Sequence, residues 1–254
     1  MPLRRPVLAG NWKMHKGPGE AREFFASFLE LYSLHEDRTV AFFPPAISLQ
    51  AARAALGERT DVLLGVQNIY WKKKGAFTGE ISAGMAADAG AQLVLVGHSE
   101  RRHVFGETTE ETVRKVRAAL DASLQAMLCV GETLDERRAG EQERVVREQL
   151  EPVLDAISAD HVHRLSIAYE PVWAIGTGET ASPADAAAMH RSIREQLRQR
   201  LGEEVAGEIP ILYGGSVSPD NARELLAQPN VDGVLVGGAS LDPQRFAAIC
   251  QDSP

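Results

Sequence analysis

The stretch Leu93-Val94-Leu95-Val96 is a short apolar run that is followed directly by Gly97 and His98. Seven further runs of this kind recur along the chain, at residues 7–9, 40–43, 62–66, 126–130, 165–169, 209–213 and 231–236. The runs start about 32 residues apart on average, and helical periodicity fills the segments between them, which is typical of a repeated strand–helix unit. Apolar strands joined by helices predict a parallel sheet covered by helices.

Helix signals separate the runs. Ser182-Pro183-Ala184-Asp185 offers an N-cap serine, a first-turn proline and an acid, and Ser218-Pro219-Asp220 repeats the pattern. Apolar residues at three- and four-residue spacing predict helices over residues 21–34, 110–120, 144–157 and 184–201. Because no Pro/Ser-rich linker divides the chain, we expect residues 1–254 to form a single (β/α)8 barrel domain of eight parallel strands surrounded by helices. An open doubly wound sheet is the alternative.

The composition narrows the possible partners. The chain has 254 residues, of which 44% are apolar and 24% charged, as in a soluble globular protein. Cys129 and Cys250 form no C-x-x-C pair, which favours a reducing compartment, the cytoplasm, over a disulfide framework or a thiolate zinc site. We find no apolar run long enough for a bilayer span or a signal peptide. The formal net charge of −8 argues against nucleic acid and membrane partners, so an anionic substrate would need local dipoles and placed cations.

Polar residues directly follow several of the runs. Asn11 and Lys13 follow the first, His98 the fourth and Glu170 the sixth. In (β/α)8 barrels the carboxyl ends of the strands carry the chemistry, so we expect these side chains on one rim. Each has a more ordinary interpretation: a glutamate is most often a surface carboxylate, a lone histidine a core residue, and a lysine a solvated charge. Their joint position at strand ends favours a site.

Two glycine-rich turns lie at the same end of the predicted barrel. Gly214-Gly215-Ser216 follows the seventh run, and Gly237-Gly238 follows the eighth. Such turns present unhindered backbone N–H groups, which suits a phosphate, and many barrels bind phosphate at these two positions. One Gly-Gly pair alone is more often a packing turn or a helix cap. The two together predict a phosphate site.

The segment after Glu170 is too long for a simple turn and too apolar for a solvated loop. We interpret it as a lid that excludes water, with a permanently packed surface loop as the alternative. The lid residues are Pro171, Val172, Trp173, Ala174, Ile175, Gly176, Thr177 and Gly178. Residues 176–181 also fit the dinucleotide pattern G-x-G-x-x-A, but weakly, because they do not directly follow a strand. A metal at His161 and His163 is disfavoured, because these histidines precede the sixth run.

Six stretches in order make the sequence resemble the triosephosphate isomerase family over essentially its whole length. They are residues 10–14 (GNWKM), 75–80 (GAFTGE), 96–102 (VGHSERR), 168–178 (AYEPVWAIGTG), 213–217 (YGGSV) and 235–241 (LVGGASL). The resemblance implies interconversion of dihydroxyacetone phosphate and D-glyceraldehyde 3-phosphate through an enediolate, a step of glycolysis and gluconeogenesis. It also implies that the reaction needs no cofactor and no metal.

The resemblance further implies a role for each matching residue. Glu170 would be the base, a neutral His98 would polarise the carbonyl group, and Asn11 and Lys13 would stabilise the charge on oxygen. Glu100 matches a further carboxylate of the family, whose role stays open. The residues implied in phosphate binding are Gly176, Ser216, Gly237 and Gly238. The family is a homodimer, and the residues implied in its interface are Met14, Gly75, Phe77, Thr78 and Glu80.

Two other functions stay open at this point. A Schiff-base aldolase needs a reactive lysine on an inner strand, and none of the apolar runs contains a lysine. A catalytically silent barrel that binds a phosphorylated ligand would have lost the base or the electrophile, whereas Glu170 and His98 are both present.

Overall fold

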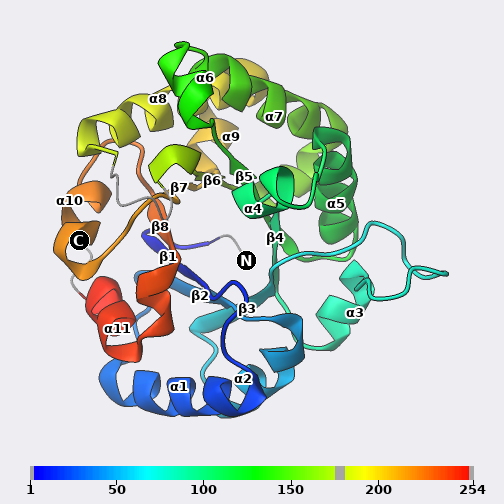
Figure 1. Cartoon of the computed structure of the whole chain (residues 1–254), viewed down its shortest axis with the longest axis vertical. Coiled ribbons are helices and arrows are strands. Elements are labelled where there is room, and N and C mark those ends of the chain that lie inside the picture. The colour runs from blue at the N-terminus through cyan, green and yellow to red at the C-terminus, as the bar shows by residue number, and fades with distance from the viewer. Residues whose placement is uncertain (1–2, 175–180, 252–254) are drawn as a thin grey trace.

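A computed structural model describes residues 3–174 and 181–251 of the chain (Figure 1). Eight parallel strands form a closed barrel in which each strand pairs with its neighbours in sequence and β8 closes onto β1. The strands are β1 Val7–Asn11, β2 Thr39–Phe43, β3 Val62–Val66, β4 Leu93–Val96, β5 Gln125–Val130, β6 Leu165–Tyr169, β7 Ile211–Tyr213 and β8 Gly233–Val236. The predicted barrel is therefore confirmed, and the open doubly wound sheet is wrong.

Helices surround the barrel on its outer side (Figure 1). The α-helices are α1 Pro18–Leu31, α2 Leu49–Leu56, α3 Ala83–Asp88, α4 Ser99–His103, α5 Thr109–Asp121, α6 Leu134–Arg138, α7 Gln142–Ala156, α8 Pro183–Leu201, α9 Glu203–Glu208, α10 Pro219–Leu226 and α11 Pro243–Gln251. Short 3-10 turns occur at η1 Ala46–Ser48, η2 Ala159–Arg164, η3 Val172–Ala174 and η4 Gly238–Leu241. None of the described helices is long and apolar enough to cross a membrane.

The predicted helix start at Ser182 is confirmed in detail. The Ser182 hydroxyl accepts the Asp185 N–H at 3.1 Å, and the Asp185 carboxylate accepts the Ser182 N–H at 3.2 Å, so that α8 begins with a reciprocal capping box. Helix α1 differs from its prediction, because it begins at Pro18 and ends at Leu31. Proline fits the first turn of a helix, and Tyr32 leaves the helix in an extended conformation.

Two strands are shorter than predicted. Strand β7 begins at Ile211, after Pro210, which has no N–H to donate to the sheet. Strand β8 begins at Gly233, where a Cβ atom would lie 2.1 Å from the carbonyl oxygen of Val7. The close approach of β8 to β1 explains why glycine, rather than another branched residue, stands at this position.

Apolar side chains form two packed layers. One fills the barrel interior and includes Phe43, Leu95, Met127 and Cys129. The larger layer lies between the sheet and the helices. In it the indole ring of Trp12 packs against Phe24 at 4.8 Å between ring centroids, and its Nε1 donates to the carbonyl oxygen of Ser240 at 3.0 Å. Buried aromatic packing with a satisfied N–H thus fixes the chain at the carboxyl end of β1.

His190 of α8 is fully buried, and its Nδ1 donates to the carbonyl oxygen of Asn230 at 2.9 Å. Burial lowers the pKa of His190 from 6.5 to about 4. As the pH falls, the His190 imidazole is therefore protonated in the unfolded chain at a higher pH than in the folded chain. About 3 kcal/mol of the free energy of unfolding is lost between pH 6.5 and 4 for this reason. We expect the free energy of unfolding of the His190→Asn variant, measured with denaturant at several pH values, to lack this part of its dependence on pH. An equal slope in wild type and variant would contradict the expectation, and His103→Asn, at an exposed site, serves as the control.

Candidate active site

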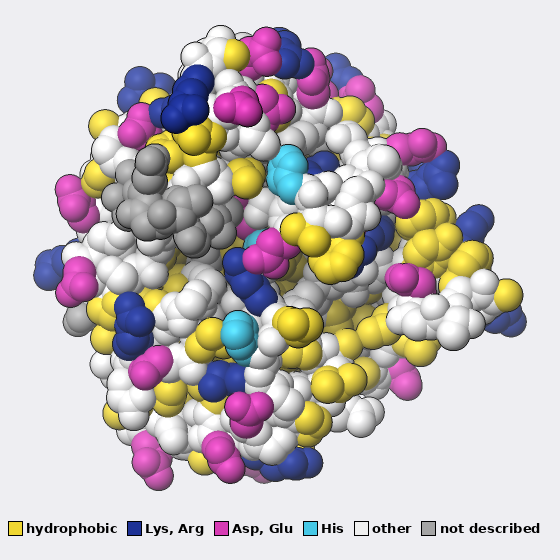
Figure 2. All heavy atoms as spheres, viewed as in Figure 1, with side chains coloured by type: hydrophobic (Ala, Val, Ile, Leu, Met, Phe, Trp, Pro, Cys, Tyr) yellow, Lys and Arg dark blue, Asp and Glu magenta, His cyan; other side chains and the backbone are white. Residues whose placement is uncertain are grey.

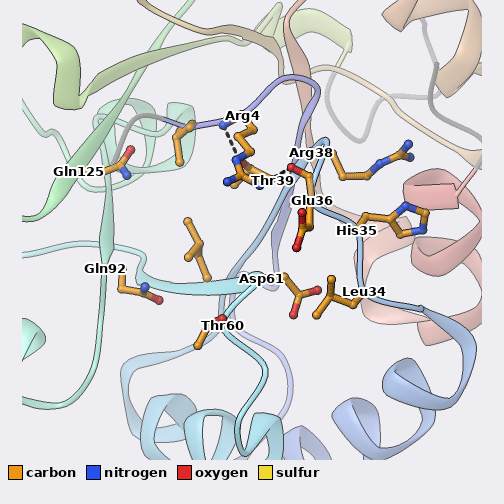
Figure 3. Close-up of a pocket in the computed structure, with 12 residues that line it drawn as sticks. Arg4, Leu34, His35, Glu36, Arg38, Thr39, Thr60, Asp61, Gln92 and Gln125 are labelled. Carbon is orange, nitrogen blue, oxygen red and sulfur yellow. Dashed lines mark hydrogen bonds between the residues drawn. The ribbon is translucent and has the colours of Figure 1, made fainter.

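Two cavities lie at opposite ends of the barrel. The one at the amino-terminal end has a volume of about 470 Å³, and its labelled side chains come from the starts of the strands and the loops before them (Figure 3). Two of its lining side chains already form ion pairs, since Asp61 binds Arg59 at 2.7 Å and Arg38 binds Asp37 at 2.8 Å. Its lining histidine, His35, lies 3.8 Å from the exposed carboxylate of Asp37.

The cavity at the carboxyl ends of the strands has a volume of about 330 Å³. Figure 2 views this end of the molecule, where charged side chains gather near the centre of the face. The lining residues are Asn11, Lys13, His98, Glu170, Gly214, Gly215, Ser216, Val217, Ser218, Leu235, Gly237, Gly238, Ala239 and Arg245. The structure therefore brings together most of the predicted site, and it adds Arg245.

Glu170 follows β6 and is held by the two neighbouring strands. Its N–H donates to the carbonyl oxygen of Val130 at 2.8 Å. On one side, a Cβ atom at Gly131 would lie 1.7 Å from the Glu170 carbonyl oxygen. On the other side, a Cβ atom at Gly214 would lie 2.9 Å from the Glu170 Cγ. Glycine is thus required beside Glu170 by close packing, in addition to any contact with a ligand.

The Glu170 carboxylate is 2% exposed and has two donors. Its Oε1 lies 3.0 Å from Nε2 of His98, and its Oε2 accepts the Ser99 N–H at 2.9 Å. Burial alone would raise the pKa of Glu170, but His98 and the Ser99 N–H outweigh burial and lower that pKa below its ordinary value. The carboxylate is therefore ionised at neutral pH and can act as a base.

His98 is the N-cap residue of α4. Its Nδ1 accepts the Glu100 N–H at 3.2 Å, so in the neutral ring the proton lies on Nε2, which faces Glu170. Burial disfavours the imidazolium, yet the Glu170 carboxylate raises the pKa of His98 above its ordinary value. Burial and the Glu170 carboxylate thus act on the protonation of His98 in opposite directions.

A buried charged network holds the peptide that precedes His98. Gly97 has a φ of +70°. Its N–H donates to Glu107 Oε1 at 3.1 Å, and its carbonyl oxygen accepts from Arg102 Nε at 2.9 Å. Glu107 also binds Lys115 Nζ at 2.5 Å. Sequence reasoning missed Arg102, Glu107 and Lys115, because only the fold brings their side chains to the end of β4.

Lys13, which follows β1, also lines the cavity and has a φ of +51°. Its N–H donates to Asn11 Oδ1 at 3.0 Å, and its carbonyl oxygen accepts from Gln67 Nε2 at 2.8 Å. Its Nζ forms an ion pair with Glu100 Oε1 at 2.5 Å. Glu100 thus reaches the site through Lys13, although it does not line the same cavity as Glu170. Gln67 is a further residue that holds this turn and that sequence reasoning did not single out.

The two glycine-rich turns meet at the other end of the cavity. Gly215 could not carry a side chain, because its Cβ would lie 2.2 Å from the Tyr213 hydroxyl. Within the described parts of the chain, Gly238 has no atom within 4 Å of its Cβ position, and Gly237 has only the Lys13 Cε, at 3.6 Å. The backbone of this turn is therefore accessible to a ligand. The fourth predicted phosphate contact, Gly176, lies outside the described residues.

The first part of the predicted lid packs against the barrel. Val172–Ala174 form the turn η3, whereas Ile175, Gly176, Thr177 and Gly178 lie outside the described residues. The indole Nε1 of Trp173 donates to Glu132 Oε1 at 2.9 Å, and the Tyr169 hydroxyl donates to the same carboxylate at 3.0 Å. Burial raises the pKa of Glu132. Glu132 thus links the end of β6 to the start of the lid segment.

The residues expected in a dimer interface project from this face. The loop between β3 and α3 extends away from the barrel (Figure 1), and Gly75, Thr78 and Glu80 lie exposed in it. Phe77 of the same loop is 38% exposed, and Met14 is 94% exposed. Among the described residues, no group of three or more His, Cys, Asp or Glu side chains is arranged to hold a metal ion.

Comparison with known proteins gives a consistent result. The family model "Triosephosphate isomerase" matches residues 6–253. A triosephosphate isomerase from Roseiflexus sp. (strain RS-1) is 51% identical over 99% of this chain and 99% of the relative. That from Solibacter usitatus is 47% identical over 97% of this chain and 99% of the relative. That from Symbiobacterium thermophilum is 49% identical over 98% of this chain and 96% of the relative.

The packing around Glu170 can be tested at Gly131. An alanine at this position would force the ends of β5 and β6 apart, because its Cβ would lie 1.7 Å from the Glu170 carbonyl oxygen. We expect Gly131→Ala to lower the free energy of unfolding by about 1–3 kcal/mol or more, as measured by denaturant unfolding. Gly207→Ala is the matched control, because it lies in helix α9 with open space around its Cβ position. Wild-type stability of Gly131→Ala would contradict the expected clash.

Proposed function

Because the chain belongs to the triosephosphate isomerase family and interconverts dihydroxyacetone phosphate and D-glyceraldehyde 3-phosphate, we propose that this reaction takes place in the cavity at the carboxyl ends of the strands. The observation that carries the proposal is the contact between Glu170 and His98, at 3.0 Å in a cavity that Lys13 also lines. This contact places a base and a proton donor side by side beside a cation, as proton transfer next to a carbonyl group requires.

In this proposal Glu170 moves a proton between the two substrate carbons through an enediolate. The lowered pKa keeps the carboxylate ionised, and the Ser99 N–H and His98 hold it before substrate binds. A positioned base of this kind accelerates a reaction by about 10²–10⁴-fold. The carboxylate must exchange these partners for the substrate carbon, so the contacts of Glu170 are those of a resting arrangement.

His98 polarises the substrate oxygen with its Nε2–H. Once the substrate oxygen replaces Glu170 beside Nε2, the main cause that raises the pKa of His98 is removed. The Glu100 N–H on Nδ1 remains, and it favours the neutral ring. His98 therefore acts as a neutral donor in the proposed complex. Asn11 and Lys13 add stabilisation of charge on the oxygen, a contribution of about 2.7–4 kcal/mol for one well-placed donor.

The phosphate group is assigned to the turns at Ser216, Gly237 and Gly238, with Gly176 as a fourth contact from the lid. Lack of side chains at Gly237 and Gly238 supports the assignment, since backbone N–H groups can then approach an anion closely. Closure of the lid residues would exclude water from the enediolate and so suppress loss of phosphate. The phosphate end of the substrate is thus assigned to the glycine-rich turns, and the reacting carbons are assigned to Glu170 and His98.

Neither alternative function is supported. None of the eight strands contains a lysine, so the barrel interior offers no amine for a Schiff base. The base and the electrophile are both present in one cavity, unlike in a silent binding barrel. For localisation we propose the cytoplasm, in line with the two free, buried cysteines.

The role of Glu170 is tested by the Glu170→Gln variant. We expect turnover in a coupled assay for glyceraldehyde 3-phosphate to fall at least about a hundredfold, because the amide cannot accept the proton. Inhibition by inorganic phosphate should change little, because the phosphate turns are untouched. Glu141→Gln, an isosteric change in a partly exposed residue of another loop, is the control. Wild-type turnover of Glu170→Gln would overturn the assignment.

We also propose that the chain forms a homodimer through this face. A cavity of about 230 Å³ opens next to the active site and is lined by Asn11, Lys13, Met14, Gln67 and Phe105, among others. Phe105 is 67% exposed, and large exposed apolar side chains around a hollow mark an interface. The projecting loop of a second copy would insert Thr78 there, beside Asn11 and Lys13.

The dimer is tested by Thr78→Arg, which places a bulky charge at the tip of the inserting loop. We expect a monomer in analytical ultracentrifugation and about tenfold or greater loss of turnover, because Lys13 and Asn11 would lose the packing that surrounds them. Thr60→Arg, at an exposed threonine of the amino-terminal cavity, should stay dimeric and active. A fully active dimer of Thr78→Arg would refute the proposed insertion.

A further inference from the structure

Arg245 lines the active-site cavity although no sequence motif points to it. It lies in the first turn of α11, which follows the glycine-rich turn at Gly237 and Gly238 through η4. Its N–H donates to Asp242 Oδ1 at 2.9 Å, which fixes the start of the helix. The side chain is exposed, so its guanidinium can reach a ligand without loss of a buried contact.

The charges around the cavity make this arginine important. Among the residues that the structure describes, three lining side chains are charged, Lys13, Glu170 and Arg245. The first two have opposite signs, so Arg245 gives this described part of the lining its net positive charge. Lys13 is in addition bound to Glu100 at 2.5 Å. Among the residues that the structure describes, no carboxylate forms an ion pair with the Arg245 guanidinium.

The substrate presents a charge that must be matched. A phosphate monoester carries about −1.5 to −2 charges near pH 7, whereas the chain has a formal net charge of −8. Backbone N–H groups offer partial charges at short range, but they do little at a distance. A guanidinium at the cavity mouth acts over about 8–10 Å at physiological ionic strength, and it can bind two phosphate oxygens at once.

We propose that Arg245 is a specificity-determining residue that attracts and binds the phosphate dianion of the substrate. This inference rests on the proposed assignment of the phosphate to the turns at Ser216, Gly237 and Gly238. Arg245 lies in the helix that follows the turn at Gly237 and Gly238, and no hydrogen bond or ion pair among the described residues joins it to Glu170 or His98, so we expect it to act on binding and on association rather than on proton transfer. The ligands it favours are dianionic phosphate monoesters over neutral sugars.

The test compares Arg245→Gln with wild type in steady-state kinetics at several ionic strengths and in inhibition by inorganic phosphate. We expect KM and the inhibition constant of phosphate to rise about three- to tenfold, with kcat within twofold. The reason is that the lost interaction is equally strong in the substrate complex and in the transition state. The fall of kcat/KM with added salt should also become shallower. Arg245→Lys, which keeps the charge and loses the planar fork, should lie between the two.

Arg147→Gln is the matched control, because it removes one exposed arginine from α7 and lowers the net charge equally. Turnover of D-glyceraldehyde, which has no phosphate, should be the same in wild type and Arg245→Gln. The inference is overturned if Arg245→Gln shows the KM and phosphate inhibition of Arg147→Gln, or if it lowers turnover of D-glyceraldehyde. In either case loss of turnover in Glu170→Gln would still support the proposed function, so the two failures can be told apart.

Discussion

The close approach of β5 and β7 to Glu170 is the constraint on which the rest of the site depends. Gly131 and Gly214 flank Glu170, and neither position has room for a Cβ atom. The N–H of Glu170 and the N–H of Gly214 continue the sheet beyond its last regular residues, at 2.8 and 2.7 Å. Because the barrel is closed, a shift of one of these strands would be passed to its neighbours. The orientation of the carboxylate is thus determined by backbone packing and only then by its hydrogen bonds.

The fold could be predicted from the sequence because its signals are local. Each apolar run, such as the one at residues 165–169, contains the information for its own strand, and Ser182 with Asp185 marks a helix start within four residues. The errors occurred at the ends of elements, as at Tyr32 after α1 and Ile211 at the start of β7. There a cap or a proline determines where the element begins or ends, and periodicity does not. The place of Glu170 and His98 at strand ends indicated a site, whereas their roles were implied by the resemblance of the surrounding stretches to the family.

The supporting residues could not be predicted in the same way. Glu107 holds the Gly97 N–H, and Lys115 neutralises Glu107, but a glutamate before a helix and a lysine within it resemble ordinary surface charges in sequence. Only burial distinguishes them, since both are less than 10% exposed. Arg245 was missed for a similar reason, because its helix reaches the cavity only through closure of the barrel. Residues that act through partners distant in sequence need the tertiary structure to be found.

The cavity at the amino-terminal end of the barrel shares no lining residue with the active-site cavity. Of its lining side chains, Asp61 is paired with Arg59 and Arg38 with Asp37, and the Gln92 side chain accepts the Leu64 N–H within β3. The two ends of each strand therefore meet separate demands, one for folding and one for chemistry. For protein engineering, this separation makes the amino-terminal end the place to attach a surface, a cross-link or a fused segment, because the active-site residues lie at the other end of the strands.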